Sequence, residues 1–195
     1  MTTAAPRFSA IQRTAAQTRV LDAALNLISE HGVSSTSLQM IADAMGVTKA
    51  AVYRQFKTKD EIVIALTERE LARLEEALEA AESEESATRA RELLLIRVID
   101  EAIERRRAVA ALQFDPIIVR FLASHEPFQR FVGRLYAVLI GNADREAGPE
   151  ARLTAAMLSG AIAVGVMHPL VADVDDATLR RQLLLYTRRL VDLPE

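Results

Sequence analysis

The chain of 195 residues contains no cysteine, no tryptophan and only three histidines. Without cysteine it can form no disulfide, use no thiol nucleophile and offer no thiolate to a metal ion. This composition suits a reducing compartment, so we expect a cytoplasmic protein. The N-terminal residues MTTAAPRFSAIQR also lack the apolar core that a secretory signal needs.

Motifs of catalysis are missing as well. The sequence has no glycine-rich phosphate loop and no nucleophile elbow. A di-iron helical bundle would need Glu three residues before His on two helices. None of His31, His125 and His168 has an acidic residue at that position. We therefore expect no enzyme, no metal site and no cofactor.

One segment is apolar enough to raise the question of a membrane span. Residues 153–172 carry no charge unless His168 is protonated, and their length is about that of a bilayer-spanning helix. The segment nevertheless contains Thr154, Ser159 and Pro169 among many Ala and Gly residues. This mixture favours a helix that packs against other protein, and we expect no membrane partner.

The pattern that is present is helical. Half of the residues are hydrophobic and 26% are charged, which is typical of a globular protein. Apolar residues recur at three- and four-residue spacing, and strand-like alternation is rare. We predict an all-α fold of about nine helices, near residues 14–30, 36–45, 48–56, 58–81, 87–106, 116–124, 127–144, 149–167 and 177–190. The stretch 107–114 has no assignment.

Charge is distributed unevenly along the chain. Residues 1–59 carry a net charge of +4 and residues 60–195 a net charge of −7. All three lysines, Lys49, Lys57 and Lys59, fall within eleven consecutive positions. A basic N-terminal part on an acidic body suggests a polyanionic partner for that part alone.

The lysines lie in a pattern that predicts a helix-turn-helix. Thr36 and Gln39 form a capping box that starts a short helix, and Gly46 permits the tight turn that ends it. Thr48 caps the next short helix. Thr58 with Glu61 forms a second capping box, which opens a long helix. Ile41, Met45, Val47, Val52 and Phe56 are expected to point inward onto the first helix.

The outward face of this pattern is small and polar at first and then basic, which suits insertion into a DNA major groove. Lys49 and Arg54 are candidates for guanine edges or phosphates, and Ala50 or Ala51 for a thymine methyl group. Tyr53 could reach a phosphate. The candidate DNA contacts are Thr36, Ser37, Gln39, Thr48, Lys49, Ala50, Ala51, Tyr53, Arg54, Lys57 and Lys59.

The run TRVLDAALNLISEHGVSSTSLQMIADAMGVTKAAVYRQFKTKDEIVIAL resembles the DNA-binding domain of the TetR family of transcriptional regulators. The elements that carry the resemblance are ALNLISEHG, the TS before the second helix, IADAMGVTKAAVYRQF and KTKDEI. Gln55 is a departure, because relatives frequently have His there. The resemblance implies a homodimer that reads an inverted repeat, and a small-molecule effector. We expect a flexible N-terminal arm (1–12) and a helix-turn-helix domain (13–60), and the resemblance implies that the rest (61–195) is a helical regulatory and dimerisation domain.

Two further sets of residues are candidates in the C-terminal part. An apolar ligand pocket could be lined by Phe114, Phe121, Phe131, Met157 and His168, although the aromatic residues could equally be filled core. The last two helices are expected to pair with their copies in a dimer. The residues predicted for this interface are Leu153, Met157, Gly160, Val164, Leu183, Leu184 and Leu190.

Together these features predict a homodimeric DNA-binding transcriptional regulator, a repressor that a small, largely apolar ligand releases from its operator. The alternative is a helical interaction module whose basic N-terminal part binds an acidic protein partner.

Overall fold

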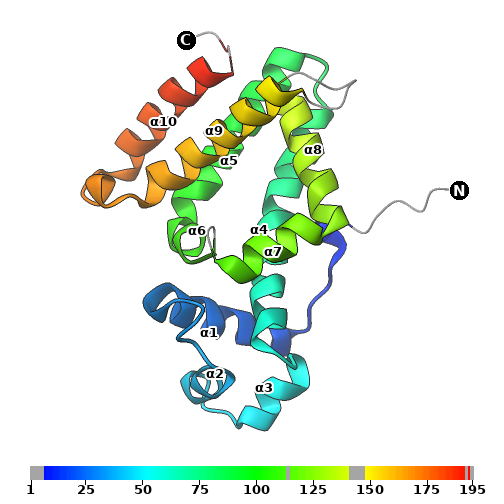
Figure 1. Ribbon diagram of the computed structural model, residues 1–195, viewed down its shortest axis with the longest axis vertical. Coiled ribbons are helices and arrows are strands. Elements are labelled where there is room, and N and C mark those ends of the chain that lie inside the picture. Colours follow the sequence, from blue (N-terminus) through cyan, green and yellow to red (C-terminus); the bar gives the residue numbers. More distant parts are fainter. Residues whose placement is uncertain (1–6, 113–114, 141–147, 192, 194–195) are drawn as a thin grey trace, which may run out of the picture. The chain divides into compact units, whose positions relative to one another are not determined.

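The computed structural model describes residues 7–112, 115–140, 148–191 and 193, and every regular element among them is a helix (Figure 1). The all-α prediction is therefore confirmed. The α-helices are α1 (Ala15–His31), α2 (Leu38–Ala44), α3 (Lys49–Gln55), α4 (Lys59–Glu82), α5 (Ala87–Glu104), α6 (Arg106–Leu112), α7 (Pro116–Ser124), α8 (Glu126–Ile140), α9 (Pro149–Met167) and α10 (Asp176–Leu190). Two 3-10 turns are η1 (Phe8–Ala10) and η2 (Pro169–Val171).

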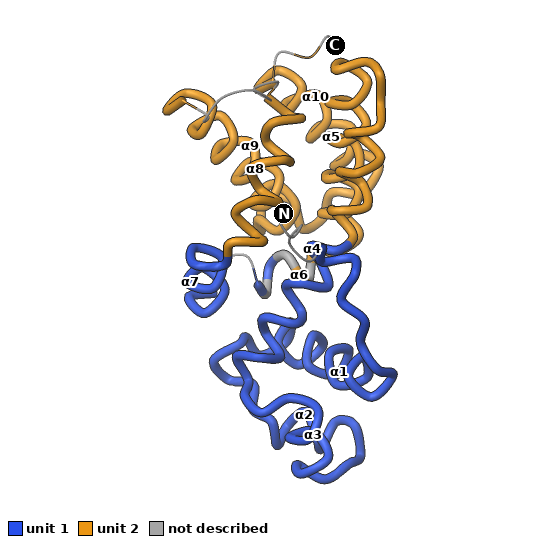
Figure 2. The backbone as a smooth tube through the Cα atoms, turned by 90° about the vertical axis from the view of Figure 1, so that its right-hand side faces the viewer, with its two compact units in different colours: residues 1–72, 110–125 blue, residues 73–109, 126–195 orange. Residues whose placement is uncertain are grey.

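The chain forms two compact units, coloured separately in Figure 2. The first comprises residues 1–72 and 110–125, and the second comprises residues 73–109 and 126–195. Helix α4 contributes residues to both units, and α7 belongs to the first unit. Helix α7 belongs to the first unit because Ile117, Ile118 and Leu122 on it pack with the core of that unit.

The core of the first unit is built from six helices, with Leu112 as the contribution of α6. The buried apolar residues of this core include Leu21 and Ile28 on α1, Ile41 on α2, Val52 on α3, Ile62 and Leu66 on α4, and Ile118 on α7. Burial of each Leu or Ile side chain contributes about 1.5–3 kcal/mol. Two ion pairs add to the α1–α4 contact: Arg13 Nη2 lies 2.8 Å from Glu68 Oε2, and Arg69 Nη1 lies 2.7 Å from Asp22 Oδ1.

Part of the predicted N-terminal arm packs against the first unit. Phe8 in η1 is buried, with 3% of its surface exposed. Its ring centroid is 6.1 Å from that of His125, and His125 lies 4.4 Å from the ring of Phe121. These three rings join the residues before α1 to the end of α7, and residues 1–6 lie outside the described part of the chain.

Side-chain caps set the starts of several helices. Thr14 and Gln17 form a capping box at α1, which was not predicted. Asp115 caps α7 in front of Pro116, and Asp175 caps α10. The hydrogen bond from the backbone N–H of Thr178 lowers the pKa of Asp175. Pro149 stands at the start of α9, as predicted.

The second unit packs α9 against α5, α8 and α10, and α9 and α10 lie side by side (Figure 1). Gly165 on α9 allows a close approach to α10, because a Cβ atom built there would lie 2.7 Å from Leu183 Cδ2. Arg180 on α10 donates from Nε to Asp100 Oδ1 on α5 at 2.5 Å, and Arg188 pairs with Glu92. These contacts join the last helix to the body of its own subunit.

Helix α9 is the one helix among the described residues that is long and apolar enough to cross a membrane, by length and composition alone. One side of it packs on neighbouring helices through Ala155, Leu158, Ile162 and Val166, all buried. The core helix of a soluble protein passes the same test, so the feature is weak evidence of a span.

The Gly165–Leu183 approach gives a first prediction. Gly165→Ala should lower the free energy of unfolding by about 1–2 kcal/mol, because the added methyl group displaces a well-packed Leu side chain. In a Leu183→Ala background the same change should be neutral or stabilising, since the methyl group then enters vacated space and Ala favours the helix. Urea unfolding of the four chains measures this coupling, and additive effects would contradict the close approach.

Candidate nucleic-acid interface

Helix α2 begins one residue later than predicted. Its N-cap is Ser37, whose hydroxyl accepts a hydrogen bond from the backbone N–H of Met40. The predicted Thr36–Gln39 capping box is therefore wrong. Thr36 is 2% exposed and donates from Oγ1 to the carbonyl of Gly32 at 2.9 Å. A hydroxyl that is buried and already bonded cannot reach DNA, so we remove the Thr36 side chain from the candidate contacts.

The turn between α2 and α3 has the predicted geometry. Gly46 adopts φ +65°, a left-handed conformation that favours glycine. The backbone N–H of Val47 donates to the carbonyl of Ala42 at 3.0 Å, which closes the turn. Thr48 caps α3 by accepting from the N–H of Ala51 at 3.2 Å. Val52 faces the core as predicted, but Val47 is exposed, contrary to the expectation that it points inward.

The outward face of α3 carries most of the candidate contacts. Lys49, Ala50, Tyr53 and Arg54 are exposed, and Ala51 is half-buried. Inward packing of Val52 directs this face to solvent, since residues next to a buried position on a short helix lie on its flanks and far side. The face is uniformly small, polar or basic, with no acidic side chain between Thr48 and Gln55.

Two exposed residues beside this face are held by neighbours. Gln39 donates from Nε2 to Asp43 Oδ1 at 2.7 Å within α2. The ammonium group of Lys57 lies 4.8 Å from the centre of the Tyr53 ring, which is a cation–π distance. The Lys57 contact orients the phenol of Tyr53 while leaving it half exposed.

The start of α4 is fixed by several hydrogen bonds. Thr58 Oγ1 accepts from the N–H of Glu61 at 3.1 Å, as the predicted capping box requires. The Glu61 carboxylate, however, accepts from the N–H of Lys57 at 2.7 Å. Lys59 donates from Nζ to the carbonyls of Val33 at 2.8 Å and Ser34 at 3.1 Å. Lys59 is thus engaged by the loop between α1 and α2.

The interface residues therefore group by element: Ser37 and Gln39 on α2, Thr48 to Arg54 on α3, and Lys57 in front of α4. Two short helices joined by a glycine turn, packed on a third helix and presenting a basic face, form a helix-turn-helix. The first unit is accordingly a DNA-binding domain of the helix-turn-helix class.

Comparison with known proteins finds sequence relatives of the helix-turn-helix unit. Residues 20–66 match the model of "Bacterial regulatory proteins, tetR family". Over 100 residues the chain is 39% identical to the HTH-type transcriptional regulator AcrR of Shigella flexneri, covering 49% of this chain and 46% of that protein. Over 78 residues it is 31% identical to the fatty acid metabolism regulator protein of Bacillus subtilis (strain 168), covering 40% of each. The chain thus aligns with about half the length of these curated relatives. Residues 20–66 are thus similar to the DNA-binding domain of TetR-family transcriptional regulators.

The fold similarity extends over nearly the whole chain. The fatty acid degradation regulator FadR from Bacillus halodurans superposes with a TM-score of 0.72, covering 93% of this chain and 97% of that chain. The sequence identity of 17% means that this match describes the fold only. The C-terminal helices therefore share their fold with the corresponding part of that protein.

The predicted pocket residues that the structure describes differ in their exposure. Phe114 lies outside the described residues. Phe131 is buried, Phe121 is half-buried against His125, and Met157 is 53% exposed on α9. His168 is exposed, and its Nδ1 accepts from the N–H of Leu170 to cap η2. Met157 and His168 thus lie at the surface of the described chain, and their place in a ligand pocket stays a prediction.

A hollow of about 430 Å³ opens at the surface of the second unit. It is lined by Glu84, Arg89, Glu92, Leu93, Ile96 and Arg97, none of which was predicted. Four of these six side chains are charged, so the hollow is unlike an apolar ligand pocket. Among the described residues, no group of three or more His, Asp or Glu side chains could hold a metal ion.

The predicted interface residues separate into two groups. Leu153, Met157, Gly160 and Val164 recur at four- and three-residue intervals on α9, opposite the buried side of that helix. Leu153, Met157 and Val164 are 62%, 53% and 40% exposed. Leu183, by contrast, is buried against Gly165 of its own chain, so its predicted place in an intermolecular contact is wrong. Leu184 and Leu190 are half-buried.

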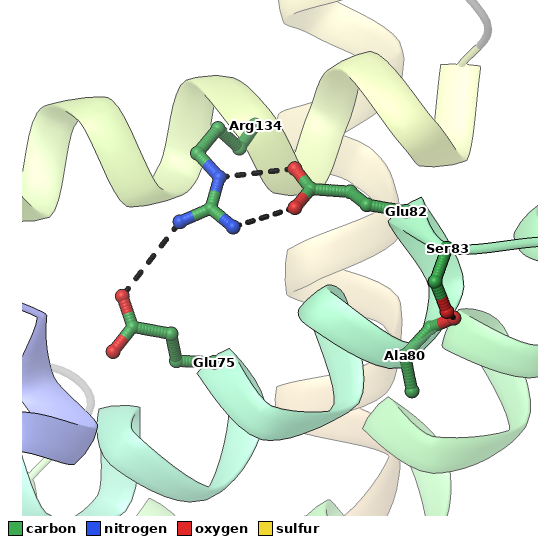
Figure 3. A network of polar contacts seen from close by, with 5 residues as sticks. All are labelled: Glu75, Ala80, Glu82, Ser83 and Arg134. Atoms are coloured by element: carbon green, nitrogen blue, oxygen red, sulfur yellow. Dashed lines mark hydrogen bonds and ion pairs between the residues drawn. The ribbon is translucent and has the colours of Figure 1, made fainter.

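An ion-pair cluster missed by the sequence analysis joins α4 to α8 (Figure 3). Arg134 donates from Nε and Nη2 to both carboxylate oxygens of Glu82, at 2.9 and 2.6 Å. Its Nη1 is 3.7 Å from Glu75 Oε1, and Glu75 is buried. The hydrogen bonds to Glu82 raise the pKa of Arg134. Helical spacing places Glu75 and Glu82 on one face of α4, but nothing local pointed to Arg134.

Proposed function

We propose that this protein is a homodimeric transcriptional repressor that binds an inverted-repeat DNA operator in the cytoplasm. The observation that carries the proposal is the exposed face of α3, where Lys49, Ala50, Tyr53 and Arg54 stand free of the core. Short side chains at Thr48 and Ala50 permit close approach to base edges. Lys57, Arg54 and the Tyr53 hydroxyl are suited to phosphates.

Dimerisation is supported by the apolar stripe on α9. Three large side chains, Leu153, Met157 and Val164, line a helix face and are 40–62% exposed, and Tyr186 on α10 is 57% exposed. Gly160 lies within this stripe, with no atom within 4 Å of a Cβ built there. A second copy would bury these groups by two-fold symmetry. The dimer would also set the spacing of two recognition helices at about 34 Å.

The DNA-reading role predicts two distinct kinds of defect. Lys57→Met should weaken binding to every sequence similarly and reduce the slope of log K against log salt by about 0.9 for each phosphate that the variant no longer neutralises. Lys49→Ala should instead change which sequences are preferred, at about 1–3 kcal/mol per base contact. Fluorescence anisotropy on duplexes selected from a random library by the wild-type chain measures both.

The same experiment tests the alternative of an acidic protein partner. A chain that binds acidic proteins through general charge would enrich no sequence from the library. Equal effects of the Lys57 and Lys49 variants on all duplexes would contradict the assignment of α3 as the reading helix.

The α9 stripe predicts that Met157→Glu breaks the dimer, because two carboxylates would be buried near the symmetry axis. Val119→Glu is the matched control, since Val119 on α7 is 51% exposed and lies outside the stripe. Analytical ultracentrifugation should give a monomer for Met157→Glu and a dimer for wild type and Val119→Glu. A dimeric Met157→Glu protein would place the interface elsewhere.

We further propose a small, largely apolar effector that releases the protein from DNA. Two relatives are regulators of fatty acid metabolism and degradation by name, which suggests an aliphatic chain as the first probe. Helix α4 begins beside the recognition helix, and its C-terminal part is held by Arg134 on α8. An effector that alters the α4–α8 contact would therefore bias the DNA-binding state.

Hexadecanoate is the probe for this coupling. We expect it to raise the melting temperature and to weaken DNA binding about 5- to 150-fold. Arg134→Met should reduce the factor by which hexadecanoate weakens DNA binding. Arg130→Met should leave that factor unchanged, because Arg130 pairs with Glu126 on its own helix. Bound hexadecanoate with unchanged DNA affinity would contradict the coupling.

A further inference from the structure

The loop between α1 and α2, residues 32–37, is held at both of its ends. Gly32 has φ +80°, and its N–H donates to the carbonyl of Ile28 at 2.8 Å, which ends α1. Thr36 closes the loop on itself: its hydroxyl donates to Gly32 O at 2.9 Å and its N–H to Val33 O at 3.3 Å. The side chains of Val33 and Thr36 are buried, so the loop has little freedom on its inner side.

Lys59 holds the outer side of this loop through two hydrogen bonds. Its ammonium group donates to Val33 O at 2.8 Å and to Ser34 O at 3.1 Å, across 26 and 25 residues of sequence. Two of the three N–H groups of the ammonium are thereby used within the protein. The side chain is half-buried, whereas Lys49 and Lys57 are exposed.

The hydrogen bonds of Lys59 constrain α2 and α4, the two helices on either side of α3 in the sequence. Lys59 is the first residue of α4, and Ser37, the N-cap of α2, follows Ser34 by three residues. Fixing the carbonyls of Val33 and Ser34 to Lys59 therefore fixes the start of α2 relative to the start of α4. Helix α3 connects to both, through the turn at Gly46 and through residues 56–58.

We propose that Lys59 is a positioning residue for DNA reading: its ammonium holds the α1–α2 loop, and so the N-terminus of α2, in the arrangement that lets α2 and α3 enter the groove together. Its main partners are two backbone carbonyls of its own chain. This inference rests on the proposed DNA-binding function, and it separates Lys59 from Lys57, whose exposed ammonium is available to a phosphate.

The experiment compares Lys59→Met, Lys59→Gln and Lys57→Met with wild type on two duplexes, one selected by the wild-type chain from a random library and one of scrambled sequence. Lys59→Met keeps the aliphatic stem and removes all donors, and Lys59→Gln keeps N–H donors without charge. Dissociation constants are measured by anisotropy over a salt series, at a temperature where circular dichroism shows each variant folded.

For Lys59→Met we expect about a tenfold loss of affinity for the selected duplex, a smaller loss for the scrambled one, and a salt slope close to wild type. Lys59→Gln should recover part of the affinity at the same slope. Lys57→Met should lose affinity on both duplexes equally, with a reduced slope. The reduced discrimination between duplexes is the readout that a purely stabilising role of Lys59 would not give.

A fall in the salt slope for Lys59→Gln as large as that for Lys57→Met would overturn the inference, because Lys59 would then neutralise a phosphate. Unchanged affinity and discrimination in both Lys59 variants would overturn it as well. If Lys59→Met does not fold, Lys59→Gln alone makes the distinction. Failure of the wild-type chain to select any sequence would instead refute the proposed function, and the two failures are therefore distinguishable.

Discussion

The contact on which the rest of the DNA-binding unit depends is the apolar packing of α2 and α3 on α1. Ile41 and Val52 turn inward to meet Leu21 and Ile28, and each of the four is at most 2% exposed. A helix of seven residues has barely two turns, so one buried side chain decides which side chains face water. Burial of Ile41 and Val52 thus sets which face of α3 points to solvent. The basic residues of that face do not determine its orientation.

Much of this local structure could be predicted because the signals act over three or four residues. Thr48 caps α3 as predicted, since a cap needs only a short polar side chain and a free N–H two or three residues later. Gly46 marks its turn for an equally local reason. Thr36 and Ser37 are both suited to cap α2. Thr36 is buried in the tertiary structure and Ser37 is the cap, and the sequence spacing does not distinguish between them.

Features that depend on distant parts of the chain could not be predicted. The carbonyl partners of Lys59 lie about 26 residues away, and Arg134 meets Glu82 across 52 residues. Leu183 and Met157 are both apolar residues on helices expected to dimerise, yet one is buried within the subunit and the other is exposed. Periodicity identifies the apolar positions of a helix, but it does not say whether its neighbour is the same chain or another.

The discontinuity of the first unit has a consequence for how the protein is made. Its core includes Leu112 and Ile118, so the segment 1–72 alone lacks part of its own interior. During synthesis, α1 to α4 leave the ribosome with that side uncovered until α7 follows, about 40 residues later. For the same reason, a hybrid protein that fuses α1 to α4 of this chain to the C-terminal helices of another regulator would also need α7 of this chain.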